Sequence, residues 1–315
     1  MFRYLKQRLY LFIPTLIGTT LLAFILGHIT SADPALVILT MDGMSAPSAA
    51  DVAAKRVELG LDAPLFIQYM RWSYHVLLGD WGRSYVTNLP VLNTLWTAAQ
   101  VTLQLGGLSF VMVVLSSITL GVTMTLLRRH WIGESLNTLS ILYTSVPLFW
   151  VAIIALQIGS ENLHIFPTSG YQTWWHFMLP AIILGIPSTG LIMRVQRDAL
   201  TQVLEEQYFL MARAKGFPKL YAVYRHGLKN SCIAVATLLG NYLLAILGGS
   251  ALVEIIFGLP GLGMVVYEAI RARDYPMIQG YVVMVGALTI SINIGVDVLY
   301  LWLNPKIRKG AYRES

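Results

Sequence analysis

The stretch VTLQLGGLSFVMVVLSSITLGVTMTLL, residues 101–127, decides the fold. It contains no charged residue and is followed at once by Arg128 and Arg129. A helix of about 20 apolar residues crosses the hydrocarbon core of a bilayer, so this stretch is long enough to span one. The whole chain is 56% hydrophobic and only 12% charged, against about 25% charged residues in soluble domains. The sequence therefore predicts an integral membrane protein.

Five further apolar segments predict an all-α protein with six transmembrane helices. The first segment follows a basic start and lacks a small-residue cleavage site, so we expect a retained helix rather than a removed signal peptide. An even number of spans places both termini on the same side of the membrane. The five segments are residues 9–29, 139–158, 177–193, 233–257 and 281–303.

The basic residues predict which side is cytoplasmic. With the N-terminus inside, 16 of the 22 Lys and Arg residues fall in inner segments and six in outer ones. This bias follows the positive-inside rule and predicts that both termini are cytoplasmic. The net charge of +6 is thus explained by membrane topology, and no nucleic-acid partner is expected.

These spans divide the chain into four parts. Residues 1–29 form a tail and the first helix, 30–100 a folded outer segment, 101–303 the transmembrane core, and 304–315 an inner tail. In the outer segment, residues 48–60 predict a helix that begins near Asp51 and ends at Gly60. In the inner loop 196–230, residues 198–215 predict a helix that Gly216 and Pro218 end.

Several kinds of chemistry are missing from the sequence. No Walker A run of Gly-x-x-x-x-Gly-Lys-Ser/Thr occurs, so any nucleotide hydrolysis must take place on another chain. No catalytic residue is assigned. The single Cys232 and the spacing of the six histidines predict no metal site, although His164 and His176 share an outer loop and could converge on a metal. Interfacial polar contacts are the simpler interpretation of these two histidines.

Polar, proline and glycine residues in the spans are candidates for lining or bending a pathway. Glu254 and Asp297 are ionisable groups within predicted spans, which are either paired structurally or used in transport. Proline and paired glycines kink helices or let them approach closely, and broken helices are tolerated where they face a cavity. The pathway candidates are Pro147, Asn241, Gly248, Gly249, Glu254 and Asp297. In the outer connection, residues 264–271 predict an amphipathic helix.

A series of motifs in order resembles the inner-membrane permeases of bacterial peptide and nickel ABC importers. The inner loop supplies two of them, YFLMARAKG at 208–216 and RHGLKN at 225–230. The others are residues 33–35, 59–62, 64–65, 68–69, 248–250, 253–257, 260–263, 273–276, 297–300 and 304–308.

The resemblance implies a type I ABC importer permease fold in the bacterial inner membrane. It implies a transport subunit, not an enzyme, that pairs with a second permease subunit as a heterodimer. Two cytoplasmic ATPases would bind ATP and Mg, this chain itself would bind no cofactor, and an extracytoplasmic solute-binding protein would deliver the solute. Residues 206–216 look like the coupling helix that enters a groove of the ATPase. The coupling candidates are Glu206, Ala212, Arg213, Ala214, Lys215 and Gly216.

One departure from the wider superfamily lies in this helix. Where that superfamily has Glu-Ala-Ala, this chain has Leu210, Met211 and Ala212, so only the last alanine matches. The solute is open between nickel or a metal chelate, which the outer segments resemble more, and a dipeptide or oligopeptide. An ion-coupled secondary carrier is the alternative function, and a membrane-embedded enzyme is a third.

Overall fold

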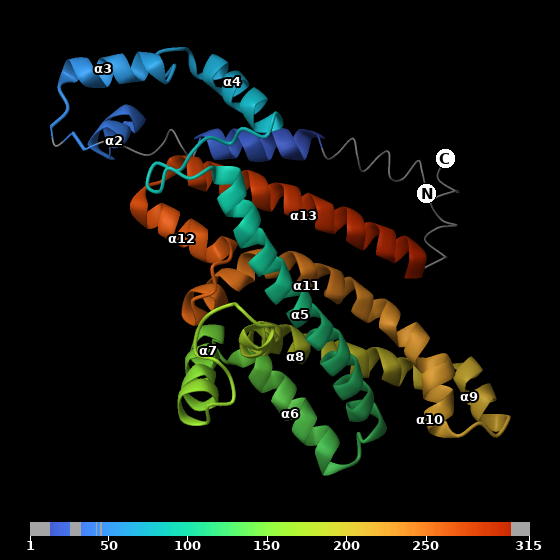
Figure 1. The fold of residues 1–315 in the computed structure, drawn as a ribbon. Helices are drawn as coiled ribbons and strands as arrows, with labels where there is room; N and C mark the ends of the chain where they lie inside the picture. The colour runs from blue at the N-terminus through green and yellow to red at the C-terminus, as the bar shows by residue number, and fades with distance from the viewer. Residues whose placement is uncertain (1–12, 26–32, 42, 45, 304–315) are drawn as a thin grey trace, which may run out of the picture. The chain divides into compact units, whose positions relative to one another are not determined.

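A computed structural model describes residues 13–25, 33–41, 43–44 and 46–303, and these residues are mostly helical (Figure 1). Within these described ranges, four helices are long and apolar enough to cross a membrane: 91–126, 175–205, 219–257 and 275–298. A bent pair of helices, Trp131–Ser145 and Leu148–Asn162, passes the same test only when the two are taken together, and Ile13–Ile25 is a shorter apolar helix. The predicted first span, 9–29, extends at both ends beyond the described residues. The helices fall within or overlap the six predicted segments.

The described chain divides into two compact units. The first comprises residues 101–259 and 292–303, and the second comprises residues 13–100 and 260–291. Helices α5 (Val91–Leu126) and α13 (Tyr275–Leu303) contribute residues to both units. The start of α5 lies inside the predicted outer segment, because Pro90 precedes it and the buried residues Val91 and Leu95 join the core of the second unit.

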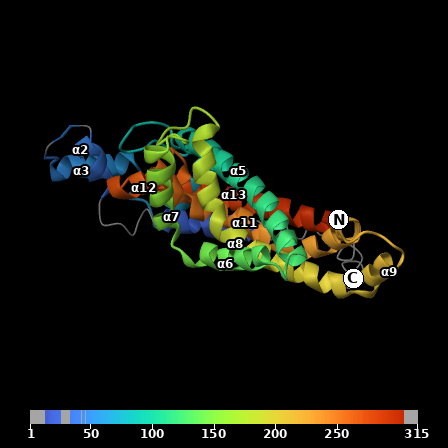
Figure 2. The ribbon, with the colours of Figure 1, turned by 90° about the horizontal axis from the view of Figure 1, so that it is seen from below.

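The first unit is a helical bundle. Its elements after α5 are α6 (Trp131–Ser145), α7 (Leu148–Ala155), the π-helix η1 (Leu156–Asn162), α8 (Trp175–Glu205), α9 (Gln207–Ala214), α10 (Lys219–Ala222), the π-helix η2 (Val223–Gly227) and α11 (Leu228–Phe257). Figure 2 shows α6, α8 and α11 running alongside one another, with α9 at the end remote from α7. Buried apolar residues of α5, α8 and α11, among them Leu105, Ile183 and Ile246, form its main core.

The third predicted span is broken by Pro147. Helix α6 ends at Ser145, and α7 begins at Leu148 after a bend of 105°. A residue that precedes proline is driven out of the helical region, and Val146 accordingly has ψ 132°, as does Pro147. Two successive extended residues account for the sharp change of direction.

Helix α8 is much longer than the predicted fourth span. It runs through Pro180 and Pro187 and continues to Glu205, so residues 198–205 continue α8 and do not begin a separate helix. The single helix predicted over 198–215 is therefore wrong at its centre, because Glu206 is extended, with ψ 143°, and separates α8 from α9. The helix expected before Gly216 is present as α9.

The second unit contains helix 13–25, α2 (Pro34–Met41), α3 (Ala49–Glu58), α4 (Leu65–Leu77), the first residues of α5, α12 (Leu262–Ala272) and the first part of α13. The helix predicted over 48–60 is confirmed as α3. Ser48 and Asp51 form a capping box at its start, and the hydrogen bonds from Ser48 lower the pKa of the Asp51 carboxyl. Gly60 follows with φ +68°, a left-handed conformation that glycine adopts readily.

The amphipathic helix predicted over 264–271 is confirmed as α12, and a buried carboxylate fixes the start of α13 behind it. Asp274 accepts hydrogen bonds from the Ser84 hydroxyl and from the backbone N–H of Tyr85. Burial raises the pKa of the Tyr85 phenol to about 12, and the Asp274 carboxylate adds to this shift. These contacts join the loop before α5 to the turn between α12 and α13 within one unit.

Candidate functional site

Helix α9 is a short element with sharp boundaries at both ends. It begins where the backbone N–H groups of Phe209 and Leu210 both donate to the Glu206 carbonyl, at 3.0 and 3.1 Å. It ends at Gly216, whose φ of +87° suits glycine and whose N–H donates to the Arg213 carbonyl at 3.0 Å. Pro218 then opens α10. The residues between Glu206 and Gly216 therefore form a separate helix at the end of α8.

One face of α9 is buried, and the opposite face is exposed. Phe209 and Ala212, three residues apart, are its buried residues. Phe209 packs in a small core with Leu200 of α8, Ala222 of α10 and Val223 of η2. Complete burial of a phenylalanine side chain contributes about 1.5–3 kcal/mol. A single aromatic anchor thus holds α9 against the neighbouring helices.

The outward face of α9 combines apolar and basic side chains. Leu210 and Met211 are exposed, and so are Arg213 and Lys215. The Arg213 guanidinium donates to the Phe217 carbonyl at 2.7 Å, which links the helix to the turn that follows it. The Asn230 amide of α11 donates to the Tyr208 hydroxyl at 2.8 Å. This face offers apolar contact and positive charge to another molecule.

The structure brings the six predicted coupling residues together on this one element. Ala212 lies on its buried face. The others are exposed: Glu206, Arg213, Ala214, Lys215 and Gly216. The small side chain of Ala212 serves packing within the chain, so it is not available to a partner.

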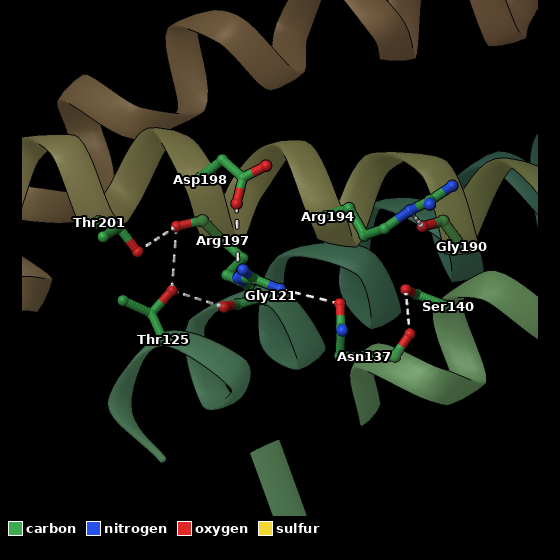
Figure 3. Close-up of polar contacts among 9 residues, drawn as sticks. All are labelled: Gly121, Thr125, Asn137, Ser140, Gly190, Arg194, Arg197, Asp198 and Thr201. Carbon is green, nitrogen blue, oxygen red and sulfur yellow. Dashed lines mark hydrogen bonds and ion pairs between the residues drawn. The ribbon is translucent and has the colours of Figure 1, made fainter. Parts of the chain in front are cut away.

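A polar cluster anchors α8 just before α9, as Figure 3 shows. Arg197 of α8 reaches across to α6, where its guanidinium donates to the Asn137 side-chain oxygen at 2.8 Å. The same guanidinium lies 3.4 Å from the Asp198 carboxylate. From α5, the Thr125 hydroxyl donates to the Gly121 carbonyl at 3.0 Å and to the Arg197 carbonyl at 3.3 Å. Three helices therefore converge on the turn of α8 around Arg197.

Glycines allow these helices to touch closely. A Cβ atom on Gly121 of α5 would lie 2.7 Å from the Gln196 Cβ and 2.8 Å from the Met193 carbonyl oxygen. A Cβ on Gly190 of α8 would lie 2.7 Å from the Tyr143 Cβ of α6. The buried Gln196 amide also donates to the Ser231 hydroxyl of α11, at 2.9 Å. We call this interface of α5, α6 and α8, with Gly121 and Gly190 at its centre, the glycine seam.

Three of the predicted pathway residues lie on one exposed face of α11. Asn241, Gly248 and Gly249 are exposed, as is Ala245 between them, and we call these four residues the open face of α11. A Cβ atom added to Gly248 or Gly249 would meet nothing within 4 Å. Packing against the described residues therefore does not explain why these two positions are glycine.

The other three pathway candidates are placed differently. Glu254 projects from the opposite side of α11 and is fully buried, and it accepts a hydrogen bond from the Thr102 hydroxyl at 2.8 Å. Pro147 is exposed at the bend between α6 and α7, and Asp297 is half-buried on α13. The structure thus separates Glu254 from the open face, and a pathway role for each candidate stays a prediction.

Sequence reasoning missed the Asn137–Arg197 contact. Arg197 counted only as a positive charge in the inner loop, and Asn137 lay at the edge of a predicted span. The sequence feature that could have predicted this contact is a polar residue just outside each of two consecutive predicted spans, near the same membrane boundary. Among the described residues, no group of three or more His, Cys, Asp or Glu side chains could hold a metal ion. His164 and His176 instead contact the Asn162 carbonyl and the Thr173 hydroxyl.

Comparisons with known proteins agree with this architecture. Residues 117–309 match the family described as binding-protein-dependent transport system inner membrane component. The glutathione transport system permease protein GsiC of Salmonella paratyphi A is 37% identical over 308 residues, covering 98% of this chain and 99% of that protein. A protein of Brucella abortus named as a candidate peptide transport system permease is 34% identical, covering 94% of this chain and 96% of its own length.

Solved structures show the same fold. Two inward-facing crystal forms of the MetNI methionine ABC transporter align with TM-scores of 0.53 and 0.56, at 15% and 16% identity. Each alignment covers 96% of the transporter chain, with 68% and 67% of this chain. The chain therefore belongs to the family of binding-protein-dependent transport system inner membrane components, and it is the permease subunit of an ABC importer.

Proposed function

We propose that this chain forms half of a translocation pathway for glutathione or other short peptides, driven by ATPase subunits that dock on α9. The observation that carries the ATPase contact is α9 itself. It is a separate short helix, seated on one buried aromatic residue, whose exposed face presents Leu210 and Met211 beside Arg213 and Lys215. An ATPase groove with apolar walls and acidic rims fits that face.

The solute class is supported by the relatives. The two described above are named as glutathione and peptide permeases, which favours the peptide alternative over nickel or a metal chelate. Membership of an ABC importer family also disfavours the ion-coupled secondary carrier.

The proposed transporter contains further subunits besides this chain. A second, different permease chain provides the other half of the pathway, against the open face of α11. Two partner subunits bind ATP and Mg and hydrolyse the nucleotide, and an extracytoplasmic binding protein delivers the solute. The basic segments, α9 included, face the cytoplasm of a bacterial inner membrane, and so do both termini. ATP binding then favours an outward-open arrangement through contacts that differ between the two states.

A charge reversal tests the docking site. In the assembled transporter in liposomes, Arg213→Glu with Lys215→Glu should abolish ATP-driven glutathione uptake while the chain still inserts and purifies. Reversal of Arg225 and Lys229, which are also exposed but lie outside α9, is the matched control and should retain uptake. Normal uptake and normal solute-stimulated ATPase activity in the α9 variant would exclude this docking site.

A backbone change tests the same helix without altering charge. Proline cannot adopt the φ of +87° at Gly216 and lacks the N–H that donates to the Arg213 carbonyl. Asparagine tolerates left-handed φ better than other non-glycine residues. Gly216→Pro should therefore uncouple ATP hydrolysis from transport, whereas Gly216→Asn should retain most coupling. Equal coupling in the two variants would contradict the proposal.

The solute class is tested by competition in the same liposomes. A dipeptide or tripeptide should reduce uptake of labelled glutathione, and a nickel chelate should not. Competition by the nickel chelate alone would restore the metal-chelate hypothesis.

A further inference from the structure

Helix α4 has apolar side chains around most of its circumference, yet none of its residues is buried. Its side chains divide into three faces. One contacts helix 13–25, one is polar, and one is an exposed apolar stripe.

The first face joins α4 to the first predicted span. The Tyr69 ring packs edge-on against Phe24 with centroids 5.5 Å apart, and Trp72 lies 6.0 Å from the same ring. The Tyr69 hydroxyl is also 3.0 Å from the Thr20 hydroxyl. The apolar sequence that includes Phe24 runs on to Ile29, so α4 is attached within this apolar stretch and not beyond its end.

The second face is polar and is used within the unit. The Gln68 amide donates to the carbonyls of Leu61 and Ala63, which holds the turn before the helix. His75 lies 3.5 Å from the Asp80 carboxylate. Arg71 is exposed on the same side. A polar face of this kind is solvated by water or by lipid headgroups.

The third face is the apolar stripe, Phe66, Met70, Tyr74 and Leu77. Its members are spaced by four, four and three residues, so they line one side of the helix. Their exposed fractions are 69%, 48%, 62% and 77%. A run of large apolar side chains this exposed marks an interaction surface.

We propose that α4 is an interfacial helix whose apolar stripe is inserted into the lipid bilayer, at the boundary between headgroups and acyl chains. The leaflet is the outer one, and this choice rests on the topology given under the proposed function. Helix 13–25, to which α4 is attached, exposes Ile17, Leu22 and Ile25 itself, as a helix surrounded by lipid does. The stripe adjoins the face that holds this helix, so lipid reaches both.

The side-chain composition fits the same occupant. Tyrosine and tryptophan concentrate at membrane interfaces, where an apolar ring and a polar edge are both accommodated. Tyr69, Trp72 and Tyr74 lie on or beside the two apolar faces of α4, and its polar face carries Arg71 and His75. Such helices insert their apolar side about 5–10 Å into the interface.

Nitroxide labels test this placement in the assembled transporter in nanodiscs of phosphatidylcholine and phosphatidylglycerol. In a Cys232→Ala background, single cysteines at Met70 and Leu77 report on the stripe, and one at Arg71 is the matched control from the polar face. Collision with oxygen, which concentrates in lipid, is compared with collision with chromium oxalate, which stays in water. The stripe labels should favour oxygen, and the Arg71 label should favour chromium oxalate.

Two results would overturn the proposal. If chromium oxalate reaches the stripe labels as well as it reaches the Arg71 label, the stripe faces water. If both reagents are excluded from the stripe, protein covers it. Repeating the measurement without the binding protein then shows whether the binding protein or another chain of the transporter covers the stripe. The measurement needs neither ATP nor solute, so its failure is distinct from a failure of the proposed transport function.

Discussion

Glycines of the first unit occur in two settings that look alike in the sequence and differ in the structure. At the glycine seam, a side chain on Gly121 or Gly190 would collide with α8 or α6. On the open face of α11, a side chain on Gly248 or Gly249 would meet nothing. The first pair is explained by contacts within the chain. No contact among the described residues explains the second pair, and a partner subunit and the pathway are the two explanations tested below.

The polar residues follow the same division. Around the seam, Arg197, Asn137 and Thr125 are hydrogen bonded to one another or to neighbouring backbone. On the open face, Asn241 is exposed. Small residues in membrane helices permit close approach, and polar side chains then bond across the contact. The seam shows this arrangement. The open face has small and polar residues of the same kind, but no described residue lies within 4 Å of a Cβ at Gly248 or Gly249.

The largest effect is expected from enlarging a seam glycine. Gly121→Leu forces a side chain to within 2.7 Å of the Gln196 Cβ and 2.8 Å of a backbone oxygen, and overpacking of this kind costs about 1–3 kcal/mol or more. We expect a lower Tm of the purified chain in detergent. Gly248→Leu is the control and should leave Tm unchanged. Equal Tm values for the two variants would mean that the seam does not stabilise the bundle.

A smaller but functionally specific effect is expected on the open face. Leucine at both Gly248 and Gly249 should leave insertion and Tm intact while lowering ATP-driven uptake about tenfold, which corresponds to about 1.4 kcal/mol in a rate-limiting barrier. Co-purification with the second permease distinguishes the two causes. If the open face contacts that subunit, the larger side chains should abolish co-purification; if it lines the pathway, co-purification should persist while uptake falls. Wild-type uptake in the double variant would show that neither a partner nor solute approaches this face.

Much of this fold could be predicted from the sequence because membrane burial leaves a simple pattern. Long uncharged runs give the spans, and Ser48, Asp51 and Gly60 give the limits of α3. The bend at Pro147 follows from local backbone chemistry. The break at Glu206 could not be predicted, since residues 198–215 contain mostly good helix formers and neither glycine nor proline, and the interruption depends on packing Phe209 against α8 and η2.

The candidate site was predicted less completely than the fold. Arg213, Lys215 and Gly216 were located by a motif, and they are exposed, while their docking role stays a prediction. The difference between Gly121 and Gly248 could not be predicted, because it depends on which helices are neighbours. The same is true of Glu254, whose charge suggested a pathway residue but whose side chain bonds to Thr102 on the far side of α11.

The smallest effect is expected from the hydrogen bond that ties α8 to α6 beside the seam. Arg197→Lys retains the positive charge but loses the planar guanidinium that reaches Asn137, and Asn137→Ala removes the acceptor. The Arg197 side chain is 38% exposed. Because solvent screens the interaction, we expect a coupling energy of about 1 kcal/mol for this pair. A double-mutant cycle on Tm measures it.

The ratio of solute transported to ATP hydrolysed then separates a structural role from a positioning role. If the bond only stabilises the bundle, both variants lose Tm and keep this ratio. Because Arg197 lies about three helical turns before α9, we expect the ratio to fall as well, since a loosened α8 transmits less of the ATPase movement to α6. An unchanged ratio with a lowered Tm would confine the polar cluster to stability and leave Phe209 as the anchor through which α9 acts.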